Sequence, residues 1–173
     1  MKIGILSDTH KKVNLTKITL NFLLEQGVEF LIHAGDIVEV EILELLAHSG
    51  VPYVAVYGNN DAHLVQYHND YNLVQEPHYF KLANTTFKLM HLPFYMTADT
   101  EIIIFGHTHQ FEVEFTKKAL YINSGEVCAR SKPLSECVVL EIKEKTFLVD
   151  YFTRKKDKKY KHKESFKYKR QKK

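Results

Sequence analysis

The stretch Ile3-Gly4-Ile5-Leu6-Ser7-Asp8-Thr9-His10 decides the fold. Residues 1–6 form a short apolar run with β-branched side chains, which predicts a strand buried on both faces. Asp8 and His10 come directly after this run and, being two residues apart, point the same way in an extended chain. A carboxylate and an imidazole leaving a buried strand are costly unless something neutralises them. A divalent metal ion would do so, and mixed oxygen and nitrogen donors suit Mn, Fe, Ni, Co or Zn better than Ca or Mg. The alternative is a capped junction of strand and loop, with Asp8 as a helix cap.

The same pattern of a buried strand followed by polar residues repeats along the first third of the chain. Apolar periodicity predicts helices over 15–26 and 38–49, and short apolar runs predict strands over 30–33 and 51–57. This alternation favours right-handed crossovers and a parallel sheet, in which ligands bind at the carboxyl ends of the strands. Asp36 follows the second strand and Asn59 the third, so we expect both beside Asp8 and His10.

The second half of the sequence is rich in strands. Residues 62–76 predict a short helix or loop, and strands are predicted over 79–82, 86–90, 101–105, 111–115, 120–123, 137–142 and 146–152. His91 follows one of these strands, and His107 and His109 follow another. We therefore expect an α/β fold with two sheets packed face to face and helices outside.

Size and charge divide the chain into a body and a tail. Residues 1–153 are enough for one domain, which carries 12 Lys and Arg against 19 Asp and Glu, a net charge of −7. Residues 154–173 carry 12 Lys and Arg against two acidic residues, a net charge of +10, and few aliphatic side chains, so we expect a mobile basic tail. It would be a solvated end or a sequence-blind contact for nucleic acid. With no apolar run of about 18 residues, no leader and no disulfide framework, we expect a cytoplasmic protein without a membrane span.

The polar residues that follow strand ends make one set of metal-type donors. It contains two carboxylates, one amide and four imidazoles: Asp8, His10, Asp36, Asn59, His91, His107 and His109. Seven donors are too many for one tetrahedral site and suit two ions that share a carboxylate. Two ions about 3.5–4 Å apart can clamp a phosphate and activate a water for in-line attack.

In order along the chain, these residues spell D-x-H, G-D, G-N-x-D, a lone His and G-H-x-H. The series resembles the calcineurin-like metallophosphoesterase superfamily over residues 1 to 152, and within it the small prokaryotic phosphodiesterases of the YfcE type. The resemblance implies a four-layer α/β/β/α sandwich. It also implies that Asp8, His10 and His109 hold one metal ion, Asn59, His91 and His107 the other, and that Asp36 bridges them. Manganese is the first expectation for both ions, with Ni, Fe, Zn, Co or Mg as alternatives.

Three departures from the family pattern bear on the chemistry. Asn60 stands where many relatives have a histidine that protonates the leaving group, and an amide is no general acid. Asp61 remains, and we assign it with Asp36 and Asn59 to the catalytic set, where it would orient a group indirectly. A short connection follows His91 where relatives have a glycine and a helix, so we expect the helix to be missing or reduced to a turn. Glu126 stands where relatives often have serine, and it would add negative charge near a phosphate site if its side chain points that way.

Three functions compete at this stage. The first is a metal-dependent phosphodiesterase acting on a small phosphodiester or a nucleotide. The second is a protein-binding scaffold, like the retromer subunit of the same fold, and the third is a nuclease that holds its polymer with the basic tail. A homodimer is implied by resemblance only. His33 and Cys128 are interpreted as core residues, and Phe94 and Tyr95 as a substrate wall or a dimer contact.

Overall fold

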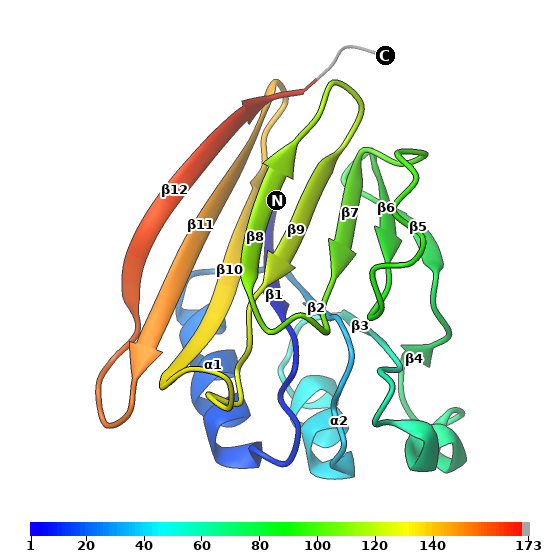
Figure 1. Cartoon of the computed structure of the whole chain (residues 1–173), viewed down its shortest axis with the longest axis vertical. Coiled ribbons are helices and arrows are strands. Elements are labelled where there is room, and N and C mark those ends of the chain that lie inside the picture. The colour runs from blue at the N-terminus through cyan, green and yellow to red at the C-terminus, as the bar shows by residue number, and fades with distance from the viewer. Residues whose placement is uncertain (171–173) are drawn as a thin grey trace.

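The computed structural model describes residues 1–170 and contains two mixed sheets that pack face to face (Figure 1). The first sheet has the order β12-β11-β10-β1-β2-β3-β4 and the second β5-β6-β7-β9-β8. The first comprises β1 (Lys2–Leu6), β2 (Phe30–His33), β3 (Tyr53–Val56), β4 (Leu73–Val74), β10 (Leu134–Ile142), β11 (Thr146–Lys155) and β12 (Lys161–Lys169). The second comprises β5 (His78–Leu82), β6 (Thr85–Leu89), β7 (Ile102–Phe105), β8 (Phe111–Phe115) and β9 (Leu120–Ser124). The helices are α1 (Val13–Glu25), α2 (Val40–Ala47) and the 3₁₀ helix η1 (Ala62–Tyr67).

The predicted buried strand is β1, at the centre of the first sheet. It runs parallel to β2, and β2, β3 and β4 continue the parallel part of the sheet. Ile3 and Ile5 enter the core between the two sheets, whereas Leu6 enters the core under the helices. Burial on both faces is the reason the sequence shows a continuous apolar run instead of an alternation.

The expected α/β class and the two packed sheets are confirmed. Helices α1 and α2 cover the outer face of the first sheet through Leu20, Leu23, Leu43 and Leu46. The outer face of the second sheet differs from the four-layer expectation, because no helix of the described residues covers it. The loop 92–100 packs there instead, with Met96 and Ala98 on a small apolar cluster. The connection from β6 to β7 is too short for the helical layer, as the spacing after His91 predicts.

The loop 92–100 is anchored by a lysine in the core. Lys88 is only 1% exposed, and its ammonium donates to the carbonyls of Tyr95 (2.9 Å) and Thr97 (2.8 Å) and pairs with Asp99 (2.5 Å). A buried ammonium is tolerated because all its donors find oxygen partners. The loop 92–100 thus covers the outer face of the second sheet and is held there by the ammonium of Lys88.

The expectation of a mobile tail is wrong for residues 154–170. β11 extends to Lys155, and β12 pairs antiparallel with it from Lys161 to Lys169. Phe166 packs on the inter-sheet core, and Tyr168 stacks on Phe115 with ring centroids 5.0 Å apart. The order comes from alternation at the end of the strand, where Phe166 and Tyr168 face inward and Lys167 and Lys169 face outward. Residues 171–173 of the expected tail lie outside the described residues.

The described part of the chain has no helix of the length and hydropathy that a membrane crossing requires.

Candidate metal centre

Five strands end at one edge of the sandwich, and the polar residues that follow them meet there. β1, β2 and β3 of the first sheet are followed by Asp8 and His10, by Asp36 and by Asn59, and β6 and β7 of the second by His91 and by His107 and His109. The parallel strands all point the same way, so their carboxyl ends share an edge. The structure brings all seven predicted ligands together, in two clusters that share Asp36.

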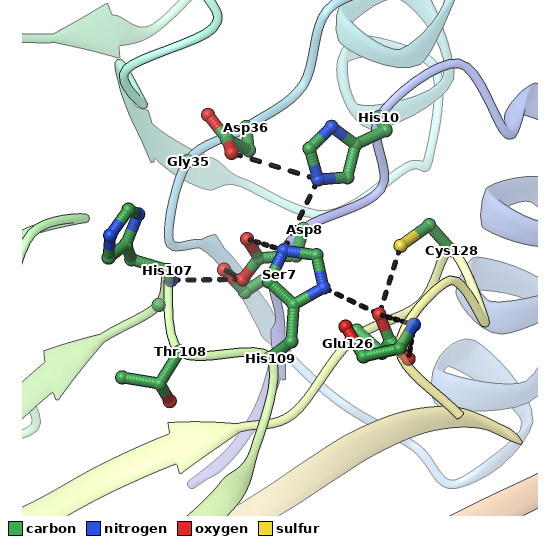
Figure 2. A network of polar contacts seen from close by, with 12 residues as sticks. Ser7, Asp8, His10, Gly35, Asp36, His107, Thr108, His109, Glu126 and Cys128 are labelled. Atoms are coloured by element: carbon green, nitrogen blue, oxygen red, sulfur yellow. Dashed lines mark hydrogen bonds and ion pairs between the residues drawn. The ribbon is translucent and has the colours of Figure 1, made fainter.

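The first cluster joins the two sheets. Donor atoms of Asp8, His10, Asp36 and His109 all lie within 4.8 Å of one another. Nε2 of His109 is 3.4 Å from Nε2 of His10 and 3.2 Å from Oδ1 of Asp8, and Nε2 of His10 is 3.7 Å from Oδ2 of Asp36 (Figure 2). Two imidazole nitrogens at this distance cannot both carry protons without repulsion, so the pair can share one proton or bind one cation between them.

The second cluster is centred on an amide oxygen. Oδ1 of Asn59 lies 3.0 Å from Nε2 of His91 and 3.0 Å from Nδ1 of His107. Nε2 of His91 is also 3.5 Å from Oδ1 of Asp36. The two oxygens of Asp36 therefore face different clusters, Oδ1 the second and Oδ2 the first.

Backbone strain gathers in the same residues. Asp8, His10, Asp36, His107 and His109 have φ values of 52°, 46°, 55°, 68° and 59°. Residues other than glycine rarely adopt this left-handed region, and each such residue costs roughly 1–3 kcal/mol. Strain of this kind persists where the surrounding structure holds side chains in a working orientation. Five of the seven predicted ligands carry it.

Two glycines let the strand ends approach each other closely. A Cβ on Gly106 would lie 2.2 Å from Oγ of Ser7, and a Cβ on Gly58 would lie 2.3 Å from Oδ1 of Asp36. Either distance is far inside van der Waals contact, so any side chain at these positions would push the two clusters apart. This is the physical reason for glycine in the motifs that introduce His107 and Asn59.

Glu126 has a role that its sequence position did not reveal. It is fully buried and accepts hydrogen bonds from Nδ1 of His109 (2.5 Å) and from the backbone N–H groups of Ser131 (2.8 Å) and Lys132 (2.9 Å). Figure 2 shows His109 between Glu126 on one side and Asp8 and His10 on the other. An ionised carboxylate only accepts, so Nδ1 of His109 carries the proton and Nε2 is free to bind a metal ion. Glu126 thus contacts a histidine of the site and not the phosphate position that we expected.

The surroundings shift the pKa values of the two carboxylates of the centre in opposite directions. Burial alone would raise the pKa of Asp36, but hydrogen bonds from His91 and Asn60 and the charge of His91 outweigh it and hold the pKa well below its ordinary value. Burial would lower the pKa of His91, whereas its contact with Asp36 raises it above the usual range. For Asp8 burial dominates and raises the pKa, against the hydrogen bond from Ser7.

One buried atom supports the fit of a cation to the first cluster. Oδ1 of Asp8 has no hydrogen-bond partner. Among residues 1–170 it is the single fully buried side-chain nitrogen or oxygen that lacks one. Its neighbour Oδ2 accepts from Ser7 Oγ (2.7 Å) and from the N–H of His107 (3.1 Å). A buried carboxylate oxygen without a donor costs roughly 1–3 kcal/mol or more, which metal coordination would offset. The donors present therefore fit a divalent ion.

Asn60 and Asp61 hold the loops of the centre. The side-chain amide of Asn60 donates to Oδ2 of Asp36 (2.7 Å), which leaves it no role as an acid. Asp61 is buried and accepts from the backbone N–H groups of Ile37 (2.9 Å), Val38 (2.8 Å) and Gly58 (2.7 Å). It ties the loop of Asp36 to the loop of Asn59 and so positions both.

Of the remaining residues singled out in the sequence, two are buried and two are exposed. His33 is buried, with a pKa lowered to about 3 by burial, and it contacts Thr9 Oγ1 at 3.0 Å. Cys128 is buried, and burial followed by its contact with Glu126 raises the pKa of its thiol to about 12. Phe94 and Tyr95 are exposed, 74% and 48%, on the loop 92–100.

The fold is that of the metallophosphoesterases, a class of hydrolases that act on phosphoric esters with divalent metal ions. The calcineurin-like phosphoesterase superfamily domain matches residues 1–145, and the chain belongs to this superfamily, so the family resemblance of the motifs is confirmed.

The chain is similar in sequence to one named protein and in fold to two solved structures. Phosphodiesterase MJ0936 of Methanocaldococcus jannaschii is 25% identical over 160 residues, which cover 85% of this chain and 96% of that protein. Vacuolar protein sorting 29 of Cryptosporidium parvum superposes with a TM-score of 0.80 at 14% identity over 98% of both chains. The phosphoesterase YfcE of E. coli superposes with a TM-score of 0.67 at 19% identity, covering 85% of this chain and 91% of that one.

Proposed function

We propose that this protein is a metal-dependent phosphodiesterase that binds two divalent ions, one at each cluster, with Asp36 between them. The observation that carries the proposal is the division of Asp36, whose two carboxylate oxygens face His10 and His91 at 3.7 and 3.5 Å. The mixed carboxylate, amide and imidazole donors favour manganese, with Ni, Fe, Zn, Co or Mg as alternatives. The similarity to a phosphodiesterase over nearly the whole length of that relative supports the substrate class.

The residues of the chain have separable tasks in this proposal. When bound, the two ions would supply positive charge for the phosphoryl oxygens and lower the pKa of a water. Asp8, His10 and His109 would hold the first ion, Asn59, His91 and His107 would hold the second, and Asp36 would contact both. Glu126 accepts the hydrogen bond from Nδ1 of His109 and so aims Nε2 at the position of the first ion. Asp61 fixes the distance between the two loops that carry Asp36 and Asn59.

Asn60 favours esters whose alcohol leaves easily. Its amide cannot donate a proton to an alkoxide, and it is engaged with Asp36. We therefore expect hydrolysis of aryl or otherwise activated diesters to be much faster than that of unactivated alkyl diesters.

The test is hydrolysis of bis(p-nitrophenyl) phosphate after chelation, with Mn, Ni, Mg and Zn added back in turn, beside the monoester p-nitrophenyl phosphate. The proposal requires turnover of the diester that EDTA abolishes and at least one metal restores. Metal binding without turnover of either ester by any of the four metals would instead favour the scaffold function that the sequence left open.

The nuclease alternative cannot be tested by deleting the basic segment, because this segment is part of the first sheet. Removing residues from 154 onward would remove β12 and the end of β11, so loss of activity would report unfolding. Replacing outward lysines of β12 by glutamine keeps the strand and tests nucleic-acid contact alone. Nucleic-acid contact and a homodimer stay predictions.

A further inference from the structure

A cavity of about 600 Å³ lies beside the first cluster. His10, a member of that cluster, lines it, and so does Cys128, whose Sγ lies within 4.8 Å of donor atoms of His10 and His109. The volume falls in the range of about 300–1,000 Å³ that is typical of small-molecule sites. A substrate held at the metal centre would therefore extend one of its arms into this cavity.

The lining of this cavity is strongly cationic. Four positive side chains come from four separate segments: Lys12 before α1, Arg130 between β9 and β10, Arg154 near the end of β11 and Lys156 in the turn to β12. No carboxylate lines the cavity within the described part of the chain. We call these four residues with their cavity the basic cavity.

None of the four charges is neutralised by the protein over residues 1–170. No Asp or Glu forms an ion pair with Lys12, Arg130, Arg154 or Lys156. Four like charges around one concave surface repel each other and raise the local concentration of anions. Their natural partner is a group with several acceptor oxygens, and arginine binds phosphate with paired hydrogen bonds.

The walls of the basic cavity also contain apolar surface, from Leu15, Ala129 and Pro133. A free inorganic anion would leave that surface without a partner, whereas a sugar or base linked to a phosphate would cover it. The combination of apolar walls and unpaired cations next to a phosphodiester-cleaving centre is that expected for a nucleotide arm.

We propose that the basic cavity binds a second phosphate group of the substrate, so that the protein selects phosphodiesters with one arm carrying a further phosphate. This inference rests on the proposed phosphodiesterase function and names its substrate class as phosphorylated nucleotides. It also gives the basic segment around residue 154 a task that does not need mobility.

The test uses two substrates that differ by one phosphate. Thymidine 5′-(p-nitrophenyl phosphate) and its 3′-phosphorylated form are both diesters and release the same p-nitrophenolate. With the metal that best supports bis(p-nitrophenyl) phosphate hydrolysis, kcat/KM should be about tenfold or more higher for the 3′-phosphorylated substrate. The preference should shrink as salt is raised, since the cavity charges are partly exposed to solvent.

Two charge variants locate the effect. Arg154→Gln and Lys156→Gln should each reduce the preference, measured as the ratio of the two kcat/KM values, by about three- to tenfold. Lys118→Gln, in the turn between β8 and β9 at the other end of the sandwich, removes the same charge and should change neither value (Figure 1).

The outcomes separate this proposal from the function on which it rests. If wild-type protein hydrolyses both substrates equally, or if neither cavity variant lowers the preference, the basic cavity does not bind the second phosphate and the diesterase function stands. If no metal supports turnover of any diester, the function itself is wrong. Lys156 is exposed on a turn, so its variant reports on charge even if Arg154→Gln proves unstable.

Discussion

The two ligand clusters differ in burial and in the groups that hold them. In the first, Asp8 is fully buried and His109 is backed by the carboxylate of Glu126. In the second, Asn59 and His107 are exposed, and His91 donates from Nδ1 to the neutral carbonyl of Ala34 at 2.8 Å. A charged carboxylate behind an imidazole fixes the direction of the ring more strongly than a neutral carbonyl does. We therefore expect the first cluster to hold its ion more tightly than the second.

The largest effect should follow from the residue that both clusters share. Asp36→Asn removes the negative charge between the two positions, so both metal affinities and the turnover of bis(p-nitrophenyl) phosphate should fall together, the latter by about 10³-fold or more. Metal analysis of the purified variant with parallel kinetics measures both. Asp70→Asn makes the same change at an exposed position and should have no effect. Two bound ions and normal turnover in Asp36→Asn would rule out its bridging role.

The comparison also shows what the sequence could and could not predict. The seven candidate ligands could be predicted because each follows a strand end, and the parallel topology then places them at one edge of the sheets. The contact of Glu126 with His109 could not be predicted, because it depends on the path of the loop after β9. In that loop Gly125 has a φ of 75°, and Glu126 accepts hydrogen bonds from the backbone N–H groups of residues 131 and 132. Such nonlocal loop geometry leaves no periodic signal.

The prediction of a mobile tail in place of strand β12 was wrong for a different reason. Its lysine content suggested a solvated tail, yet Phe166 and Tyr168 alternate with Lys167 and Lys169 at the strand period. The sequence contains this alternation and could have predicted the strand. The high lysine content describes only the outward face, whereas the two-residue period describes both faces.

The next effect should fall on the first cluster alone. Glu126→Gln replaces the carboxylate behind His109 by a neutral amide, so affinity at the tighter site should drop about 10–100-fold while the weaker site changes little. Calorimetric titration with Mn or Zn resolves the two affinities. Glu136→Gln alters a neighbouring buried carboxylate that contacts no candidate ligand and should leave both affinities within about threefold. Equal losses at both sites in Glu126→Gln would contradict the assignment of this carboxylate to one cluster.

The smallest effect should fall on the second cluster. Glu76 accepts from the backbone N–H groups of His91 and Leu92, so it orients the chain at His91 without touching the ring. In Glu76→Gln the amide oxygen can still accept both bonds, and the contact of the ring with Ala34 is kept. Affinity at the weaker site should therefore fall only about two- to fivefold, less than the roughly 10–100-fold that losing an indirect contact costs, and the tighter site should be unchanged. The same titration measures it, with Glu41→Gln on the exposed face of α2 as the matched change. A loss at the tighter site as large as that of Glu126→Gln would mean that the two clusters are not held independently.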